Sequence, residues 1–426
     1  MLPMTESRTV NRPVQLRELQ TARAKHSSTR AKQTASRAVR TVGSTSGMLF
    51  GFTLFLTIFG LVMALSASSI FALKETGSAY TIFLKQLVWV GIGFAAFAVM
   101  AFIDYRIWRR WAFLVFFVCI FLMLLLFVPG IGVTEMGSTR WLRVGSMRIQ
   151  PSEPAKLGFL LVSALVLSRK ESLLHDSLHA LIPIVFPMLT MIAILLLLQP
   201  DLGTTLVFCS IALFLLCMAG VRVQLMGALF GLAVSASLVL IAVAPYRMAR
   251  VRGVFDPLGD AQGDGYQLVQ SIIALISGGW TGTGLGASRQ KWSWLPNPHN
   301  DFIFAIIGEE LGLIGALVVL VLTFGLVLFC AQAARRAPDT FGRLIASGVA
   351  VWIAVQAVMN IGAVIGLLPI TGVVLPLVSQ GGTSAFVLLA SLGIVISVAR
   401  EGDKVVEKKL HEHRQMLAKQ RKNSRA

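Results

Sequence analysis

Long, uninterrupted runs of apolar residues are the feature of this sequence that most restricts its fold. Several runs reach about 18 residues or more, the length at which a helix crosses roughly 30 Å of hydrocarbon. Inside a bilayer every backbone N–H and C=O needs a partner within the segment, which favours helices. The alternation over about ten residues that is typical of membrane barrels is missing. With 55% hydrophobic and only 14% charged residues, the sequence predicts an all-α polytopic membrane protein.

The apolar runs predict about ten transmembrane helices. The predicted spans are residues 48–70, 84–103, 111–128, 155–168, 180–198, 202–219, 225–244, 302–331, 344–366 and 383–399. A large outer loop, at about residues 245–301, separates the seventh and eighth spans. Loops of this length are usually functional or disordered, and the apolar stretch 268–276 favours order.

The net charge of +18 is concentrated at the two ends of the chain, because residues 1–47 carry a net +7 and residues 400–426 a net +5. Basic tails beside spans are typical of cytoplasmic ends that face anionic lipid. The chain is therefore predicted to consist of a disordered basic tail (1–47), a membrane domain (48–400) and a second basic tail (401–426). No folded nucleic-acid-binding motif accompanies the charge, so nucleic acid is not an expected partner.

Lys and Arg in the short loops predict the orientation in the membrane. With the N-terminus in the cytoplasm, every predicted inner loop is basic, and an even number of spans returns the C-terminus to the same side. The outer loops are basic as well, for which two explanations stay open. Their cations are either solvated loop residues or ligands for an anion such as phosphate. The expected location is the inner (cytoplasmic) membrane.

Polar residues at three positions of the predicted outer face could carry chemistry. The first position includes Arg140 and the start of the fourth span, where Ser152 is predicted to cap the helix. Glu153 and Lys156 are i,i+3 neighbours there, and the helix dipole disfavours a lysine in the first turn, so Lys156 needs an anionic partner. The second position contains Asp201, at the start of the sixth span. Either Asp201 pairs with Lys156, or Lys156 binds a substrate phosphate while Asp201 orients it, and both can hold at once.

The third position contains His299 and Asp301, directly before the eighth span. Asp301 is either a helix cap or a catalytic base. Glu309 lies about 80° around the same helix from Asp301, and Glu310 lies on the opposite side. Acidic groups inside a span almost always face a cavity or a partner, so a polar cavity beneath Asp301 is predicted.

Two segments rich in glycine accompany these positions. Residues 278–286 fit a GxGxxA variant, but no strand precedes them, so they predict a close backbone approach and not a nucleotide-binding loop. Lys291 follows shortly after. Ser379 and Thr383 flank a pair of glycines before the last span and indicate either small-residue packing or a further part of a polar pocket.

Together these stretches resemble the SEDS family (shape, elongation, division and sporulation), whose members polymerise peptidoglycan. The resemblance covers about residues 48–400 and rests on motifs at residues 137–142, 150–157, 199–204, 291–312, 368–372 and 376–383. Residues 288–296 and the long basic N-terminus are more similar to division-type than to elongation-type members. Asn300 and Gln380 stand where a threonine and an aromatic residue are common, while Asp301 is retained.

The resemblance implies a glycosyltransferase that joins lipid II, a disaccharide-pentapeptide on undecaprenyl pyrophosphate, into β-1,4 glycan strands during cell division. An α-linked donor and a β product imply one inverting displacement, with Asp301 as the general base. The residues expected to bind substrate are Arg140, Glu153, Lys156, Asp201, Lys291, His299, Glu309, Ser379 and Thr383. A divalent cation (Mg²⁺ or Mn²⁺) could help to neutralise the pyrophosphate, although no metal ligands are predicted in the chain.

The expected partners are a class B penicillin-binding transpeptidase, other divisome membrane proteins at the septum and anionic membrane lipids. Two other functions stay open, a lipid II flippase and a non-catalytic divisome scaffold. Intramembrane Glu309 suits a proton-coupled carrier. Against a carrier stand the lack of an internal repeat and the position of the polar residues at one face of the membrane.

Overall fold

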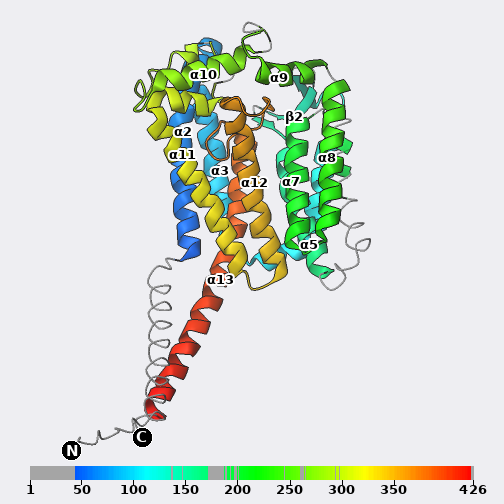
Figure 1. The fold of residues 1–426 in the computed structure, drawn as a ribbon, viewed down its shortest axis with the longest axis vertical. Helices are drawn as coiled ribbons and strands as arrows, with labels where there is room; N and C mark the ends of the chain where they lie inside the picture. Colours follow the sequence, from blue (N-terminus) through cyan, green and yellow to red (C-terminus); the bar gives the residue numbers. More distant parts are fainter. Residues whose placement is uncertain are drawn as a thin grey trace, which may run out of the picture. The chain divides into compact units, whose positions relative to one another are not determined.

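The computed structural model describes residues 44–135, 138–145, 147–170, 201–243, 245–259, 265–292, 294–296 and 298–423, together with residues 187, 190, 191, 193–195, 199 and 263. The chain divides into two compact units, residues 1–44 and residues 45–426. The second unit is a bundle of helices with one small sheet, as Figure 1 shows.

The elements follow one another along the chain in the order α2 (Thr45–Thr76), α3 (Thr81–Phe102), η1 (Tyr105–Ile107), α4 (Trp108–Leu125), β1 (Gly132–Glu135), β2 (Ser138–Val144), β3 (Met147–Ile149), α5 (Ser152–Arg169), α7 (Leu202–Met218), α8 (Val223–Val243), α9 (Pro245–Phe255), α10 (Tyr266–Gly278), η4 (Gln290–Trp292), α11 (Ile303–Arg336), α12 (Thr340–Val364) and α13 (Gly382–Asn423).

The prediction of a helical, polytopic membrane protein is confirmed. Among the described residues, seven helices are long and apolar enough to cross a membrane: α2, η1 with α4, α3, α8, α11, α12 and α13. The predicted spans at α5 and α7 also form helices, although these are shorter or less apolar. The remaining predicted span, 180–198, lies largely outside the described residues.

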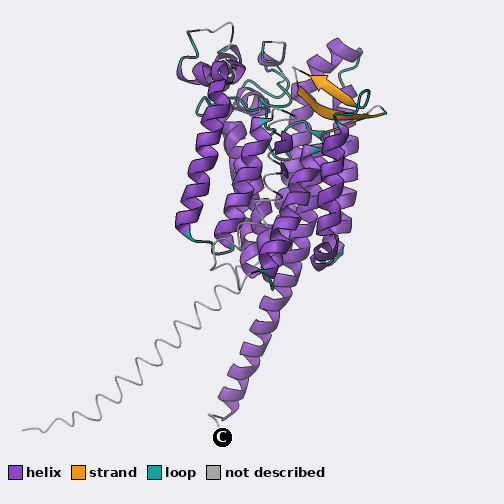
Figure 2. Cartoon of the chain, turned by 90° about the vertical axis from the view of Figure 1, so that its right-hand side faces the viewer, coloured by secondary structure: helices purple, strands orange, loops and turns teal. Residues whose placement is uncertain are grey.

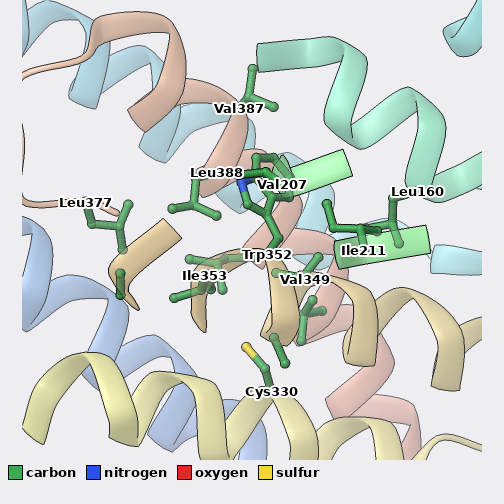
Figure 3. Packing of buried hydrophobic residues seen from close by; sticks show 14 of the residues in the cluster. Leu160, Val207, Ile211, Cys330, Val349, Trp352, Ile353, Leu377, Val387 and Leu388 are labelled. Atoms are coloured by element: carbon green, nitrogen blue, oxygen red, sulfur yellow. The ribbon is translucent and has the colours of Figure 1, made fainter. Parts of the chain in front are cut away.

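The helices differ in how much of their surface the protein itself covers. In the most apolar part of α12 and α13, 72% and 78% of the residues are buried, whereas the corresponding figure for α8 is 0%. Helices α12 and α13 therefore form the centre of the bundle, and α8 presents its apolar side chains to lipid. Figure 3 shows the core around Trp352, into which Leu160 of α5, Ile211 of α7 and Leu388 of α13 project. The buried Trp352 indole satisfies its N–H by donating to Gln356 Oε1 at 2.8 Å.

The all-α prediction is wrong at one place, because β1, β2 and β3 form a three-stranded antiparallel sheet. Trp141 pairs with Val133 of β1, and Arg143 pairs with Arg148 of β3. A tight turn at Gly145, with φ of 62°, joins β2 to β3. A sheet with exposed edges is tolerated here because this segment lies beyond the apolar helices, where water can satisfy its free backbone groups.

The predicted close approach of residues 278–286 is confirmed, and its partner is a break in α11. Gly312 interrupts that helix with φ 65° and ψ −164°. A Cβ at Gly282 would lie 2.1 Å from the carbonyl oxygen of Glu310, so only glycine fits. Four backbone hydrogen bonds join the loop to the break: Thr283 N–H to Glu309 O (2.9 Å), Gly284 N–H to Glu310 O (3.0 Å), Leu313 N–H to Gly279 O (2.9 Å) and Ile314 N–H to Trp280 O (3.2 Å).

The two ends of the bundle differ in construction. The sheet, α9 and α10 lie at one end, here called the loop end, and Figure 2 shows the sheet far from the C-terminal part of α13. At the opposite end α13 continues as helix to Asn423, well past the predicted span 383–399. Asp403 joins this extension to the bundle by accepting from Arg336 at 3.1 Å and from the backbone N–H of Ser46 at 3.2 Å.

Candidate active site

Asp301 lies at the loop end, two residues before α11 begins. The residue at the N-cap position is Phe302, which makes no side-chain cap, so the helix-cap interpretation of Asp301 is wrong. Asn360 Nδ2 donates to the backbone oxygen of Asp301 at 2.8 Å and to that of Val373 at 2.9 Å. Among the described residues, nothing donates a hydrogen bond to the Asp301 carboxylate. The backbone is therefore fixed while the carboxylate stays available.

Three charged residues from different parts of the chain act electrostatically on the Asp301 carboxylate. Burial raises the pKa of Asp301 to about 6, the cations Arg250 and Arg140 oppose this rise, and the charge of Asp201 adds to it. Gly372 also lies close, since a Cβ there would be 3.8 Å from Asp301 Oδ2. A carboxyl group whose pKa lies near neutrality can take a proton and release it again, as a general base must.

Asp201 caps α7 and faces Arg140. Its Oδ1 accepts from the Thr204 N–H at 3.1 Å and its Oδ2 from the Thr204 hydroxyl at 2.9 Å. Arg140 Nη1 lies 3.9 Å from Asp201 Oδ2. The predicted Asp201–Lys156 ion pair is therefore wrong. The hairpin of β2 and β3, which the sequence did not suggest, brings Arg140 to the start of α7 in place of the lysine.

Lys156 is buried at the start of α5, where its side chain is 1% exposed. Its Nζ lies 2.7 Å from Glu153 Oε1 and 5.0 Å from the centre of the Trp352 ring. Glu153 and Lys156, the i,i+3 neighbours identified in the sequence, are thus the residues that form the ion pair. The predicted Ser152 cap is wrong, because Pro151 occupies the N-cap position and the buried Ser152 hydroxyl has no hydrogen-bond partner among the described residues.

Replacing Lys156 with methionine is expected to lower the free energy of unfolding by about 3–5 kcal/mol, because the buried Glu153 loses its cation. A double variant, Glu153→Gln with Lys156→Met, leaves no buried charge and should recover most of this loss. Thermal unfolding of the purified variants in detergent measures both effects, with Arg247→Met as the control for loss of a basic residue at the same end. A double variant no more stable than Lys156→Met alone would show that another carboxylate neutralises Lys156.

Glu309 and Glu310 hold the segment before η4 through their side chains. Glu309 accepts from the Ser288 hydroxyl and, at 2.9 Å, from the Arg289 N–H. Glu310 accepts from Lys291 Nζ at 3.2 Å and from the Ser66 hydroxyl at 2.7 Å. Both carboxylates thus face protein partners, and Lys291 is buried in an ion pair.

His299, Ser379 and Thr383 each have a partner within the protein. The centre of the His299 ring lies 5.1 Å from that of the Phe71 ring, with the two planes tilted by 42°. Burial lowers the pKa of His299 to about 4, so the imidazole is neutral at physiological pH. Ser379 Oγ accepts from the Leu375 N–H at 2.9 Å. Thr383 Oγ1 accepts from the Gln150 N–H at 3.3 Å. All three therefore make contacts within the protein.

The structure thus brings Asp301, Asp201 and Arg140 together, whereas Lys156 and Lys291 occupy separate buried ion pairs. The sequence placed Arg250 among the outer-loop cations that could bind an anion but did not select it as a site residue. Its Nη1 donates to the Ile370 carbonyl at 3.0 Å, and its charge reaches Asp301. The available signal was only its place in a long basic loop. Over the part of the chain that the structure describes, no group of three or more His, Cys, Asp or Glu is arranged to hold a metal ion.

Comparison with known proteins identifies the same region of the chain. The family model described as "Cell cycle protein" (FtsW/RodA/SpoVE) matches residues 47–404. Stage V sporulation protein E of Bacillus subtilis (strain 168) is 38% identical over 82% of this chain and 95% of its own length. The protein named "Probable peptidoglycan glycosyltransferase FtsW" of Thioalkalivibrio sulfidiphilus (strain HL-EbGR7) is 41% identical over 80% of this chain and 86% of its own. Its namesake of Mycobacterium tuberculosis (strain ATCC 25618 / H37Rv) is 42% identical over 82% and 67%.

Solved structures agree with the fold. A chain described under "Structural coordination of polymerization and crosslinking by a peptidoglycan synthase complex" superposes with a TM-score of 0.65 at 30% identity, covering 81% of this chain and 97% of that one. The rod shape determining protein RodA of Thermus thermophilus superposes with a TM-score of 0.60 at 24% identity, over 83% and 96%, and supports the fold alone. The resemblance to the SEDS family is confirmed. Because the family model spans most of the chain and relatives are 38–42% identical over at least 80% of it, the chain belongs to the FtsW/RodA/SpoVE family of cell cycle proteins.

Proposed function

We propose that this chain is a peptidoglycan glycosyltransferase that joins the disaccharide units of lipid II into β-1,4 glycan strands during cell division. The observation that carries the proposal is the Asp301 carboxylate, which receives no hydrogen bond from the described residues, has a pKa raised to about 6 and lies beside two arginines. Relatives 41% and 42% identical are named as probable peptidoglycan glycosyltransferases. The site lies at the loop end of apolar helices, where a soluble disaccharide on a polyprenyl anchor would meet it.

The proposed reaction is a single displacement with inversion at the donor's anomeric carbon. The acceptor hydroxyl oxygen forms the new C–O bond, and the hydroxyl proton passes to the Asp301 carboxylate. The bond between the anomeric carbon and the pyrophosphate oxygen breaks, and its electron pair leaves with the pyrophosphate. This chemistry needs one base and a positive field for the leaving group, and no covalent enzyme intermediate.

A divalent cation, Mg²⁺ or Mn²⁺, is proposed as an aid to the departing pyrophosphate, where it would act as a Lewis acid. The two carboxylates near each other, those of Asp301 and Asp201, do not form a complete donor set by themselves. The substrate phosphates would have to supply further ligands, so the reaction above is written through the protein's own residues. Polymerisation after treatment with EDTA, with and without added Mg²⁺ or Mn²⁺, measures the requirement.

The decisive experiment is incubation of the purified protein with lipid II, alone and with a class B penicillin-binding transpeptidase, followed by separation of the glycan products. Glycan polymer supports the proposal. Movement of lipid II across proteoliposome membranes without polymer would indicate a flippase. The absence of both polymer and movement would indicate a scaffold. A transpeptidase partner is proposed because the solved chain that is 30% identical to this one comes from the structure of a peptidoglycan synthase complex. Location in the inner membrane at the septum, with the basic tails near anionic lipid and other divisome proteins, belongs to the same proposal.

The proposed topology has ten transmembrane helices, both termini in the cytoplasm and the loop end outside. In a variant lacking the four native cysteines, Leu285→Cys should react with an impermeant thiol reagent in right-side-out membrane vesicles. Met416→Cys should react only after the vesicles are opened. The two side chains are 60% and 57% exposed, so accessibility within the protein does not favour either one. Labelling of Met416→Cys in closed vesicles would reverse the orientation and place the site in the cytoplasm.

A further inference from the structure

Arg140, Lys156 and Lys291, the basic residues among those predicted to bind substrate, all lie beside carboxylates. The separations are 3.9 Å for Arg140 and Asp201, 2.7 Å for Lys156 and Glu153, and 3.2 Å for Lys291 and Glu310. The side chains of Lys156 and Lys291 are also only 1% and 4% exposed. A buried cation that already neutralises a carboxylate offers little net charge to an incoming anion. A pyrophosphate leaving group therefore needs a further source of positive charge.

Arg250 differs from these three cations because it is exposed and has no carboxylate partner among the described residues. It lies on the short basic helix α9, its side chain is exposed, and its Nη1 donates to the backbone carbonyl of Ile370 at 3.0 Å. Among the described residues, no carboxylate lies within ion-pair distance of its guanidinium. A guanidinium has five N–H donors, and the neutral Ile370 carbonyl takes one of them without neutralising the charge.

The bond to Ile370 also fixes where this charge lies. Ile370 is two residues before Gly372, at which a Cβ would be 3.8 Å from Asp301 Oδ2. The same loop between α12 and α13 thus contacts both the guanidinium and the carboxylate. The charge of Arg250 is the largest electrostatic influence on the Asp301 carboxyl group, ahead of Arg140 and Asp201. An exposed cation without a carboxylate partner is therefore held beside the proposed base.

We propose that Arg250 binds the pyrophosphate of the lipid-linked donor and positions it beside Asp301. This assignment rests on the proposed function and names a residue for one part of it. The planar fork of a guanidinium matches two phosphate oxygens, and its charge opposes the negative charge that grows on the pyrophosphate as the C–O bond breaks. Arg140, held near Asp201, contributes a second, smaller positive influence on the base.

Binding of undecaprenyl pyrophosphate tests the assignment without depending on catalysis. It is measured on purified protein that carries Asp301→Asn, with Arg250→Ala, Arg250→Lys or Arg252→Ala added. Loss of a charge-assisted contact is expected to weaken binding by about 10- to 100-fold for Arg250→Ala. Arg250→Lys keeps the charge and should lose less. Arg252 lies on the same helix with an exposed side chain, so Arg252→Ala is the matched control and should bind as the parent does.

A second measurement separates a direct role from a structural one. The groups that act on Asp301 are Arg250 of α9, Arg140 of β2 and Asp201 of α7. Removal of Arg250 takes away a cation that lowers the pKa of Asp301, so the acidic limb of the rate–pH profile of otherwise wild-type protein should move to higher pH. Arg252→Ala should leave the limb unchanged.

Parent-like undecaprenyl pyrophosphate binding by folded Arg250→Ala, or an equal loss in Arg252→Ala, would overturn the assignment. If Arg250→Ala does not fold, Arg250→Lys takes its place. The assignment would then be overturned if Arg250→Lys binds as the parent does and leaves the acidic limb of the rate–pH profile unmoved. If the wild type binds undecaprenyl pyrophosphate through Arg250 yet forms no glycan from lipid II, the proposed function fails while the binding site stands.

Discussion

Replacing Asp301 with asparagine is expected to reduce glycan polymerisation by about 10²- to 10⁴-fold or more, the range associated with loss of a general base. Asparagine has nearly the same shape and keeps the backbone, so the hydrogen bond from Asn360 to the Asp301 carbonyl should persist. What disappears is the oxygen that takes the acceptor's proton. The measurement is glycan yield from lipid II per folded molecule, with any required transpeptidase at equal concentration.

Protein stability is the internal control for this substitution. Burial disfavours the ionised carboxylate of Asp301, so a neutral asparagine should leave the thermal unfolding midpoint unchanged or slightly higher. A variant that unfolds earlier would owe its lost activity to folding. Near-wild-type polymer from folded Asp301→Asn would remove Asp301 from the role of base.

The wild-type rate should also report the environment of Asp301. A general base works in its deprotonated form, and burial raises the pKa of this carboxyl group to about 6 from an ordinary value of 3.8. The rate should therefore fall as pH decreases through about 6. An acidic limb near pH 4 would indicate a fully solvated carboxylate.

Replacing Gly312 with alanine is expected to destabilise the protein by about 3 kcal/mol or more. The dihedral angles at Gly312, φ 65° and ψ −164°, are essentially restricted to glycine. Forcing alanine into this conformation by itself costs about 1–3 kcal/mol. A Cβ would also lie 2.4 Å from the Gly282 nitrogen and 2.5 Å from the Trp280 carbonyl, so the glycine loop would have to leave the break in α11. Activity should fall with stability, because the displaced loop packs against the part of α11 that follows Asp301.

Gly227→Ala is the matched control for this substitution. It lies inside α8, and a Cβ there has no atom within 4 Å. Alanine favours helix over glycine by about 1 kcal/mol, so this variant should unfold at the same or a higher temperature. Thermal unfolding in detergent and hydrogen exchange of the 279–284 amides measure the difference. A Gly312→Ala protein as stable as Gly227→Ala would mean that the helix passes residue 312 without the break.

Comparison of two ion pairs shows why the candidate site was only partly predictable. The sequence contains Glu153, Lys156 and Asp201 near the same end of the spans. We expected the lysine to pair with Asp201, but its partner in the structure is Glu153. The i,i+3 geometry of one helix favours the Glu153 pair, which forms at 2.7 Å. Asp201 instead meets Arg140, and that choice depends on a hairpin whose strands no apolar run revealed.

The sequence by itself determined the membrane class, the long apolar helices and the close approach of residues 278–286, and it supplied Asp301 as the proposed base. These properties are local, because a bilayer requires each span to be long, apolar and internally hydrogen-bonded whatever its neighbours are. Only the tertiary structure decided which cations are neutralised, where Arg250 lies and that Gly312 breaks α11. Arg250 and Ile370 are 120 residues apart in the chain, and their contact follows from the packing of whole helices and loops. Electrostatic interactions depend on such distances and on burial, so the charges of the site became assignable only once the fold was known.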